Sequence, residues 1–149
     1  MTGYTESEER QALRREVAKL AGKYGREWFT AKARAGEKTT DLWLEIGRTG
    51  YLGINIPEEY GGGGGGIGDI AAVCEELAAQ GCPLLLMVVS PAICGTIIAR
   101  YGTEEQKQRW LPGIADGTVT EIAVSPGDQV AAGSVLAVVL TNFDEGEQQ

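Results

Sequence analysis

The stretch Leu42–Gly62, LWLEIGRTGYLGINIPEEYGG, decides the fold, because it joins a helix to an apolar connector and then to a glycine loop. The apolar residues at helical spacing in its first half are Leu42, Trp43 and Ile46. Gly50 suits the left-handed conformation that commonly ends a helix. The stretch therefore predicts a short helix, a connector over Tyr51–Pro57 and a loop over Glu58–Gly66.

The sequence before this stretch predicts one long helix. Thr5 followed by Glu8 forms a capping-box pattern, in which two side chains satisfy amides at the start of a helix. Apolar residues then recur at steps of three and four: Leu13, Val17, Leu20, Tyr24 and Trp28. This spacing places them on one helical face. Gly36–Thr40 is the turn that separates this helix from the next.

Three further helices are predicted after the glycine loop. Their expected bounds are about Ile67–Gln80, Leu84–Tyr101 and Thr103–Leu111. Pro91 should kink or break the second of them, because proline lacks an N–H and clashes with the preceding turn. Thr103 with Gln106 is another capping-box pattern, and Pro112 is expected to close the last helix. The expected fold is mainly α, an orthogonal or up-and-down helical domain of about five helices.

The composition changes near Asp116. All 13 Lys and Arg lie at or before Arg109, whereas residues 116–149 contain six acidic residues and no basic ones. Alternating apolar residues and a Ser-Pro-Gly-Asp turn predict two strands, Val119–Val124 and Ser134–Thr141. We therefore expect a helical domain over residues 1–117, a short two-stranded β segment over 118–141 and a disordered tail over 142–149.

Several functional classes are excluded by composition. The formal net charge of −8 argues against nucleic-acid binding, which needs a basic face. The chain has no His, so the usual general base and the commonest metal ligand are missing. The three cysteines form no C-x-x-C pattern, and we expect them to be buried, reduced thiols: Cys74, Cys82 and Cys94. No metal site is expected.

The start of the chain is too acidic and polar for a signal peptide. Cys82–Ala99 is an uncharged run of 18 residues, at the lower limit of a membrane span. It contains two prolines and a glycine, so we interpret it as a helix buried on most sides, with a membrane span as the lesser alternative. The expected location is cytoplasmic, without membrane contact.

Six consecutive glycines, Gly61–Gly66, fit a phosphate-binding pattern that places backbone amides before a helix. No acidic residue follows about 20 positions later, where Gly81 and Cys82 stand, and no Gly-Lys-Ser/Thr follows the run. A flexible loop between helices is therefore the favoured interpretation.

Three segments together resemble the N-terminal domain of acyl-CoA dehydrogenases. They are Leu42–Gly62, the Glu75–Ala78 string EELA, and Arg100–Thr118, which reads RYGTEEQKQRWLPGIADGT. The resemblance covers about residues 1–118. It implies a protein that uses FAD to oxidise the Cα–Cβ bond of acyl-CoA thioesters, and it places the catalytic Glu in a C-terminal helical domain. No residue of this chain matches that Glu, so no catalytic residue is assigned.

The resemblance also implies a substrate pocket. In the family, the helix that matches Leu84–Tyr101 lines the acyl-chain pocket, and Leu86, Val89, Ser90 and Ile93 would face it. The alternative, which we favour for an isolated domain, is that these four are ordinary core residues.

The stretch Gly117–Val139 resembles the second half of a biotinyl/lipoyl carrier domain, and this resemblance reaches to about residue 140. No Lys follows Lys107, so no residue there can accept biotin or lipoate. A rival alignment with the flavin loop of the dehydrogenases makes Ser125 and Pro126 weak candidates for FAD contacts. The two resemblances meet at Asp116–Thr118, which suggests that a truncated dehydrogenase sequence is fused to a carrier sequence.

Three functional hypotheses remain. The first is a truncated acyl-CoA dehydrogenase that is inactive alone and binds little or no FAD. The second is a non-catalytic interaction module that pairs with dehydrogenase subunits or with itself, through apolar surfaces left open. The third, a carrier module, is disfavoured by the missing Lys.

Overall fold

The computed structural model describes residues 5–117, 121–122 and 137–138. Helices dominate this part of the chain, and the first four are α1 (Glu8–Gly22), α2 (Gly25–Ala35), α3 (Thr40–Arg48) and α4 (Ile67–Ala79). A 3₁₀ turn, η1 (Glu58–Tyr60), precedes α4. A nearly continuous helix follows as α5 (Leu85–Met87), the π-helical η2 (Val88–Gly95) and α6 (Thr96–Tyr101), and α7 (Glu104–Asp116) comes last. The mainly helical class is confirmed.

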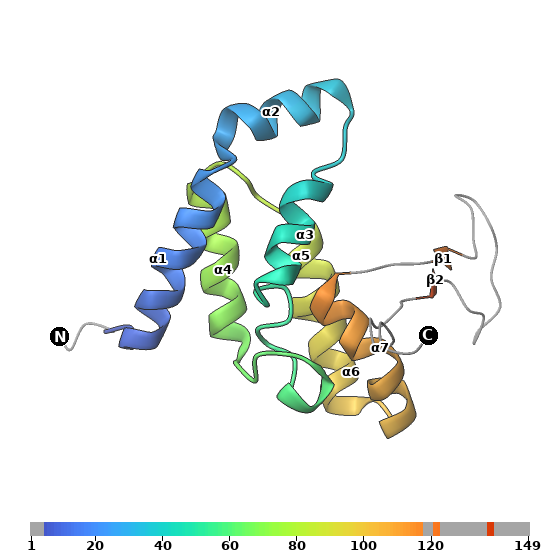
Figure 1. Cartoon of the computed structure of the whole chain (residues 1–149). Coiled ribbons are helices and arrows are strands. Elements are labelled where there is room, and N and C mark those ends of the chain that lie inside the picture. The colour runs from blue at the N-terminus through green and yellow to red at the C-terminus, as the bar shows by residue number, and fades with distance from the viewer. Residues whose placement is uncertain (1–4, 118–120, 123–136, 139–149) are drawn as a thin grey trace, which may run out of the picture.

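The helices form a layered bundle (Figure 1). α1 and α4 run side by side in the same direction, while α3 and the α5–η2–α6 helix run in the opposite direction, and α2 crosses one end. The main core lies between them and is built from fully buried apolar side chains of α1, α3, α4 and α5, including Val17, Leu42, Ile46, Val73, Leu77 and Met87. A smaller cluster joins the connector to α7 through Ile56, Tyr60, Leu111 and Ala115.

The prediction of a single long first helix is wrong in two respects. The observed helix α1 begins at Glu8 and its N-cap is Ser7, whose hydroxyl accepts a hydrogen bond from the Arg10 amide at 3.3 Å. Thr5 is therefore not the cap. The helix also ends at Gly22, because Gly25 takes a positive φ of 75° that an α-helix cannot contain. Tyr24 and Trp28 continue the apolar stripe around this corner, with ring centroids 4.7 Å apart.

The two prolines act differently from expectation. Pro91 does not break its helix, because the chain widens locally into the π turn η2, which accommodates the missing amide. Pro112 does not close the last helix, which continues to Asp116. Burial of Leu111 and Ala115 on either side of Pro112 offsets the hydrogen bond that the proline removes. The predicted Thr103–Gln106 capping box is confirmed.

The connector packs against α7 at close range. A Cβ atom on Gly53 would lie 2.6 Å from the Ala115 Cβ, so only glycine permits this contact. Trp43 of α3 donates a hydrogen bond from Nε1 to the Gly117 carbonyl at 2.9 Å. Gly50 has the predicted left-handed conformation, with φ of 80°.

Two short strands follow the helical domain. β1 (Glu121–Ile122) pairs antiparallel with β2 (Ala137–Val138), and Glu121 lies opposite Val138. Both lie within the predicted strands, whose other residues fall outside the described ones. The predicted tail, residues 142–149, also lies outside them, and the predicted division at residue 117 stays a prediction.

Candidate functional site

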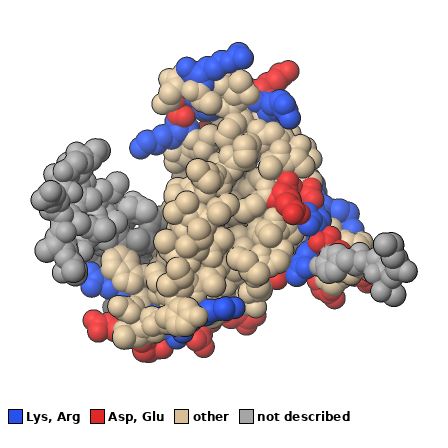
Figure 2. Space-filling view, turned by 180° about the vertical axis from the view of Figure 1, so that it is seen from behind, with Lys and Arg blue, Asp and Glu red and all other residues tan. Residues whose placement is uncertain are grey.

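The α5–η2–α6 helix carries an apolar surface that no described segment covers. Its exposed apolar side chains, here named the apolar face, are Leu85, Leu86, Val88, Val89, Ile93, Ile97 and Tyr101. The helix lies at the back of the molecule in Figure 1, and Figure 2, seen from behind, shows a broad uncharged area with charges at its margins. The expectation that Cys82–Ala99 is buried on most sides is therefore wrong.

The winding of the helix explains why one side is open. Met87, Pro91 and Gly95 are buried at steps of four residues. The exposed Leu85, Val89, Ile93, Ile97 and Tyr101 follow the same step on the other side. A π turn holds more than four residues per turn and an α-helix fewer, so the two stripes stay aligned over the whole helix.

Asn55 of the connector holds the π turn in place. Its Nδ2 donates hydrogen bonds to the Pro91 carbonyl at 2.8 Å and to the Thr96 Oγ1 at 3.1 Å. The buried Asn55 Oδ1 has no hydrogen-bond partner in the described part of the chain. The link fixes the rotation of η2 about its axis, and with it the direction of the apolar face.

A pocket with a volume of about 490 Å³ opens at the first turn of this helix. Its apolar walls are Phe29, Ala33, Trp43, Pro83, Leu84, Leu85 and Leu86, and its polar rim is Glu37, Lys38, Thr39 and Thr40. The size and lining are typical of sites that bind an apolar group with a polar end. Leu85 and Leu86 belong both to the pocket and to the apolar face, so the two surfaces are continuous.

One ion pair stands at the rim of the pocket. Lys32 Nζ donates to Glu37 Oε2 at 2.6 Å, and this hydrogen bond raises the pKa of Lys32. The ammonium also lies 6.0 Å from the centre of the Trp28 ring. The rim therefore combines a paired charge with the Thr39 and Thr40 hydroxyls.

The four residues predicted to line a substrate pocket lie on one helix. Leu86, Val89 and Ile93 are exposed and Ser90 is half-buried, so the alternative that they are ordinary core residues is wrong. Only Leu86 of the four lines the pocket described above. Their role toward a substrate stays a prediction.

Sequence reasoning missed the pocket and four of the seven residues of the apolar face, namely Leu85, Val88, Ile97 and Tyr101. An apolar residue recurs every four positions from Leu85 to Tyr101, but the residues up to Ala99 are all uncharged, so this spacing does not show which side of the helix is exposed. The pocket was not detectable either, since Phe29, Trp43 and Leu86 come from segments far apart in the sequence. Cys94 is exposed rather than buried, whereas Cys82 is buried as expected and Cys74 is half-buried.

The glycine loop does not offer amides to a phosphate. Every amide of Gly61–Gly66 donates within the loop region, for example Gly63 to the Gly53 carbonyl, Gly65 to the Ile54 carbonyl and Gly66 to Asp69 Oδ2. A Cβ atom on Gly62 would meet the Ile56 carbonyl oxygen at 2.1 Å. The loop is thus an internally hydrogen-bonded segment that lies against the connector. This supports a loop between helices over a phosphate-binding site, but the loop is hydrogen-bonded where a flexible one was expected.

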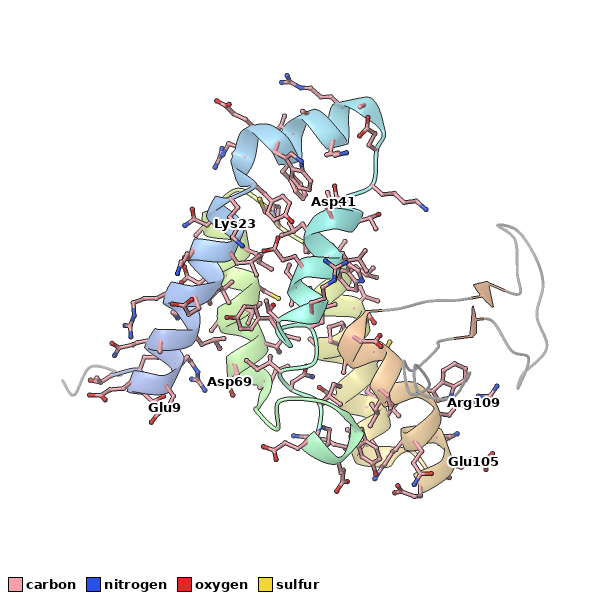
Figure 3. All side chains as sticks on the ribbon, viewed as in Figure 1. Glu9, Lys23, Asp41, Asp69, Glu105 and Arg109 are labelled. Carbon is pink, nitrogen blue, oxygen red and sulfur yellow. The ribbon has the colours of Figure 1, made fainter. Side chains whose placement is uncertain are left out.

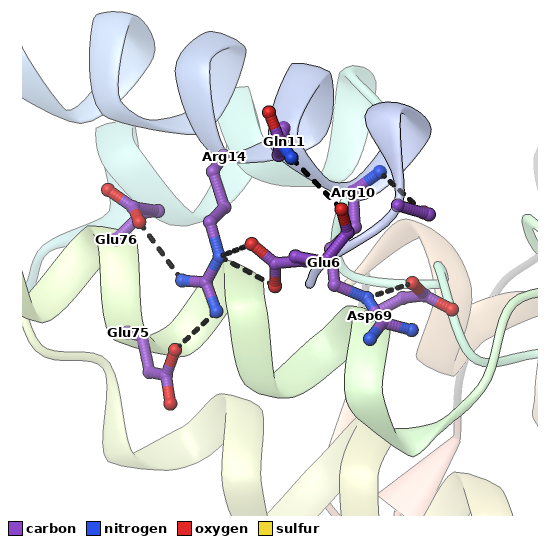
Figure 4. Close-up of polar contacts among 8 residues, drawn as sticks. Glu6, Arg10, Gln11, Arg14, Asp69, Glu75 and Glu76 are labelled. Atoms are coloured by element: carbon purple, nitrogen blue, oxygen red, sulfur yellow. Dashed lines mark hydrogen bonds and ion pairs between the residues drawn. The ribbon is translucent and has the colours of Figure 1, made fainter. Parts of the chain in front are cut away.

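The neighbouring carboxylates Glu75 and Glu76 form ion pairs with α1. Figure 4 shows the Arg14 guanidinium between Glu6, Glu75 and Glu76, with nitrogen–oxygen distances of 2.9, 2.6 and 3.0 Å. These hydrogen bonds raise the pKa of Arg14, so its charge is permanent. Through Arg14, Glu75 and Glu76 join α4 to α1.

A second ion pair lies where α4 begins. Asp69 stands beside the first turns of α1 (Figure 3) and accepts from Arg10 Nε at 2.9 Å. It also accepts from the Gly66 amide, which is the main cause of its lowered pKa, followed by the Arg10 bond. The ion pairs of Arg10 and Arg14 thus hold α1 against α4 at the surface of the domain.

The amides of the glycine loop do not suit the pyrophosphate of FAD, because each already donates a hydrogen bond within the loop region. Ser125 and Pro126, the weak flavin candidates, lie outside the described residues. The described part also contains no cluster that could hold a metal ion and no helix long and apolar enough to cross a membrane.

The sequence is similar to those of known proteins. The family model described as "Acyl-CoA dehydrogenase, N-terminal domain" matches residues 7–118. The acyl-CoA dehydrogenase FadE12 of Mycobacterium tuberculosis is 60% identical over 119 residues, which are 80% of this chain and 31% of that protein. The long-chain specific acyl-CoA dehydrogenase of Rattus norvegicus is 36% identical over 135 residues, 89% of this chain and 30% of that protein. The chain thus spans less than a third of these relatives.

Solved structures agree with the sequence matches. A chain in a structure of the electron transferring flavoprotein of Acidaminococcus fermentans superposes with a TM-score of 0.67 at 30% identity, covering 78% of this chain and 31% of that one. A chain of the ChsE4–ChsE5 complex from Mycobacterium tuberculosis superposes with a TM-score of 0.57 at 27% identity, covering 76% of this chain and 29% of that one.

Proposed function

The chain belongs to the acyl-CoA dehydrogenase family, and from this premise we propose that its helical domain supplies one wall of an acyl-chain site in a dehydrogenase. The observation that carries the proposal is the apolar face, which places Leu86, Val89 and Ile93 on the surface instead of in the core. An acyl chain needs an apolar wall without competing charges, and this helix offers one about 25 Å long.

The pocket beside α5 supports the same role. Leu86 connects the pocket to the apolar face, so an apolar ligand can extend from one to the other. The Asn55 link to Pro91 and Thr96 keeps the wall in a fixed orientation. Rigid support of this kind favours precise contacts with a substrate.

We propose further that these 149 residues alone do not dehydrogenate acyl-CoA. The amides of the glycine loop are already bonded, and the family resemblance assigns the base to a C-terminal helical domain that nothing in this chain matches. The curated relatives extend over more than three times the matched length.

A chimera tests the wall directly. Residues 7–118 of this chain replace the matching residues of the Mycobacterium tuberculosis FadE12 protein, and kcat/KM is measured for acyl-CoA thioesters of increasing chain length. We expect the chimera to keep its activity. Val89→Trp and Ile93→Trp in the chimera should lower kcat/KM for the longest substrates relative to the shortest by about tenfold, because a bulkier side chain narrows the site.

Ile67→Trp is the matched control, since Ile67 is also an exposed apolar residue but lies on α4. It should leave the chain-length profile unchanged. An unchanged chain-length profile in both Val89→Trp and Ile93→Trp would contradict the proposal that the apolar face lines the acyl-chain site.

The visible spectrum of the purified chain tests the lack of activity. With FAD added, no flavin should stay bound after gel filtration, and acyl-CoA should not bleach the flavin absorbance. Retained yellow colour with acyl-CoA-dependent bleaching would contradict the proposal.

The residues after 118 are open to two proposals. The fusion hypothesis makes them the end of a carrier domain, whereas the alignment with the rat relative covers more of this chain than residues 7–118 do and favours continuation toward the next dehydrogenase domain. Neighbouring DNA distinguishes them: an intact carrier gene and the missing dehydrogenase part nearby would support the fusion, and many relatives with the same junction would contradict it.

A second candidate function is a non-catalytic interaction module. The extent of the exposed apolar face favours it, because large apolar patches on a protein surface mark sites of interaction with other proteins.

A further inference from the structure

The apolar face is larger than a monomeric protein commonly leaves open. Its seven side chains are between 41% and 79% exposed, and at roughly 100 Å² each they leave about 700 Å² in water. The largest apolar patch on a typical monomer is about 300–600 Å². One partner in a stable complex buries about 800 Å². The face therefore has the area of one side of a protein interface.

The chemistry of the face selects an apolar partner. The run Cys82–Ala99 contains no charged residue, so two copies of the face can approach without repulsion between like charges. A charged partner would find no opposite charge along this run. Both properties fit a second copy of the same surface.

The two ends of the helix are complementary to each other. The pocket lined by Leu85, Leu86 and Trp43 opens at the first turn. Tyr101 stands at the last turn with 79% of its surface exposed. A tyrosine has an apolar ring and a polar hydroxyl, and the pocket has apolar walls and a rim with Thr39 and Thr40. An exposed group at one end thus matches a hollow at the other.

We infer that two copies of this chain associate through the apolar face in an antiparallel, two-fold arrangement, in which Tyr101 of each copy enters the pocket of the other. The stripe is spaced evenly about Ile93, which lies midway between Leu85 and Tyr101. A two-fold axis at Ile93 brings Val89 opposite Ile97 of the second copy. Residues 85 and 101 are about 24 Å apart along a helix of this length, so both pockets are filled at once.

This inference deepens the interaction role and rests on it, but it is independent of the acyl wall. The association is measured without flavin or acyl-CoA, whereas the wall is measured in the FadE12 chimera. Failure of one therefore leaves the other intact.

Sedimentation equilibrium of the full chain tests the association. The expected mass at micromolar concentration is that of two 15.8 kDa chains. Ile93→Glu places two carboxylates against each other at the axis and should raise the dissociation constant at least 100-fold. Ile67→Glu, with a similarly exposed isoleucine away from the face, should leave it unchanged within threefold. A monomer at 100 µM, open-ended aggregates, or equal effects of the two substitutions would overturn the inference.

Disulfide trapping tests the antiparallel arrangement in a Cys94→Ser background, which removes the exposed native thiol. The double variant Leu86→Cys with Tyr101→Cys should form a covalent dimer under mild oxidation, and each single variant should not. A covalent dimer of the Leu86→Cys variant alone would indicate a parallel arrangement and overturn the proposed geometry. A double variant that stays monomeric while the chain sediments as a dimer would overturn it too.

Discussion

The α1–α4 pair and the α5–η2–α6 helix belong to the same domain but have opposite surfaces. The pair buries Val17, Val73 and Leu77 and covers its outer side with ion pairs around Arg14 and Asp69. The α5–η2–α6 helix buries Met87, Pro91 and Gly95 and leaves aliphatic side chains in water. The charged side chains of the first surface find their partners within the domain, whereas the apolar side chains of the second are open to a partner or ligand. Buried residues of the α1–α4 pair therefore stabilise the fold, whereas the exposed residues of the α5–η2–α6 helix are available for function.

The largest expected effect lies in the core of the pair. Leu77→Ala removes a fully buried side chain and should lower the free energy of unfolding by about 2–5 kcal/mol. Leu86→Ala, the same change on the apolar face, should stay within about 0.5 kcal/mol. Urea unfolding at a concentration where the chain is monomeric measures both, and equal losses would contradict the distinction.

The ion pairs around Arg14 should contribute less. Arg14→Met keeps much of the aliphatic stem and removes the contacts with Glu6, Glu75 and Glu76, so we expect a loss of about 1 kcal/mol. Half of that loss should disappear in high salt, because these charges are partly exposed. Arg15→Met is the control on the same helix. An equal effect of the two substitutions would show that the Arg14 ion pairs do not contribute to the free energy of unfolding.

Acid should weaken the start of α4. The Gly66 amide and Arg10 lower the pKa of Asp69 in the folded state, so this carboxylate stabilises the fold above its unfolded pKa of about 3.9. That contribution is lost as pH falls through the lowered folded pKa. Asp69→Asn should make the stability less dependent on pH below about 4. An unchanged acid profile would contradict this assignment.

The smallest effect is expected at alkaline pH. Burial, followed by the hydrogen bond that Tyr60 donates to Glu104, raises the pKa of Tyr60 to about 12. The neutral hydroxyl therefore stabilises the fold below pH about 10, and this contribution is lost as pH rises toward 12. Tyr60→Phe should remove that part of the alkaline dependence while leaving the fold at neutral pH. A steeper alkaline loss in the variant would be the contrary result.

Local signals in the sequence predicted much of the helical order. The Thr103–Gln106 box and the left-handed Gly50 depend only on neighbours in the chain, and both are confirmed. The predicted ends of the first and last helices were wrong, because tertiary structure decides where these helices end. The positive φ of Gly25 turns the chain from α1 into α2. The burial of Leu111 and Ala115 stabilises α7 beyond Pro112. Pro91 was rightly seen as a disturbance, but the sequence does not reveal that Asn55 from another segment supports a π turn there.

The candidate site was predicted only in part. Leu86, Val89, Ser90 and Ile93 came from family resemblance, and their common helix is confirmed, although their exposure was not foreseen. The amphipathic pattern was hidden because an uncharged run of 18 residues gives no polar side to contrast with an apolar one. The pocket needs three distant segments to meet, which no local pattern can show.

The most direct test of the distinction between the two regions is the unfolding free energy of Ile93→Glu, measured in urea on monomeric protein. The variant places a charge on the α5–η2–α6 helix, where the structure leaves Ile93 about half exposed. We predict a value within about 0.5 kcal/mol of the unchanged chain, since an exposed carboxylate costs little. A loss above about 2 kcal/mol would show that Ile93 belongs to the folded core, and the apolar face would then not be a surface available for function.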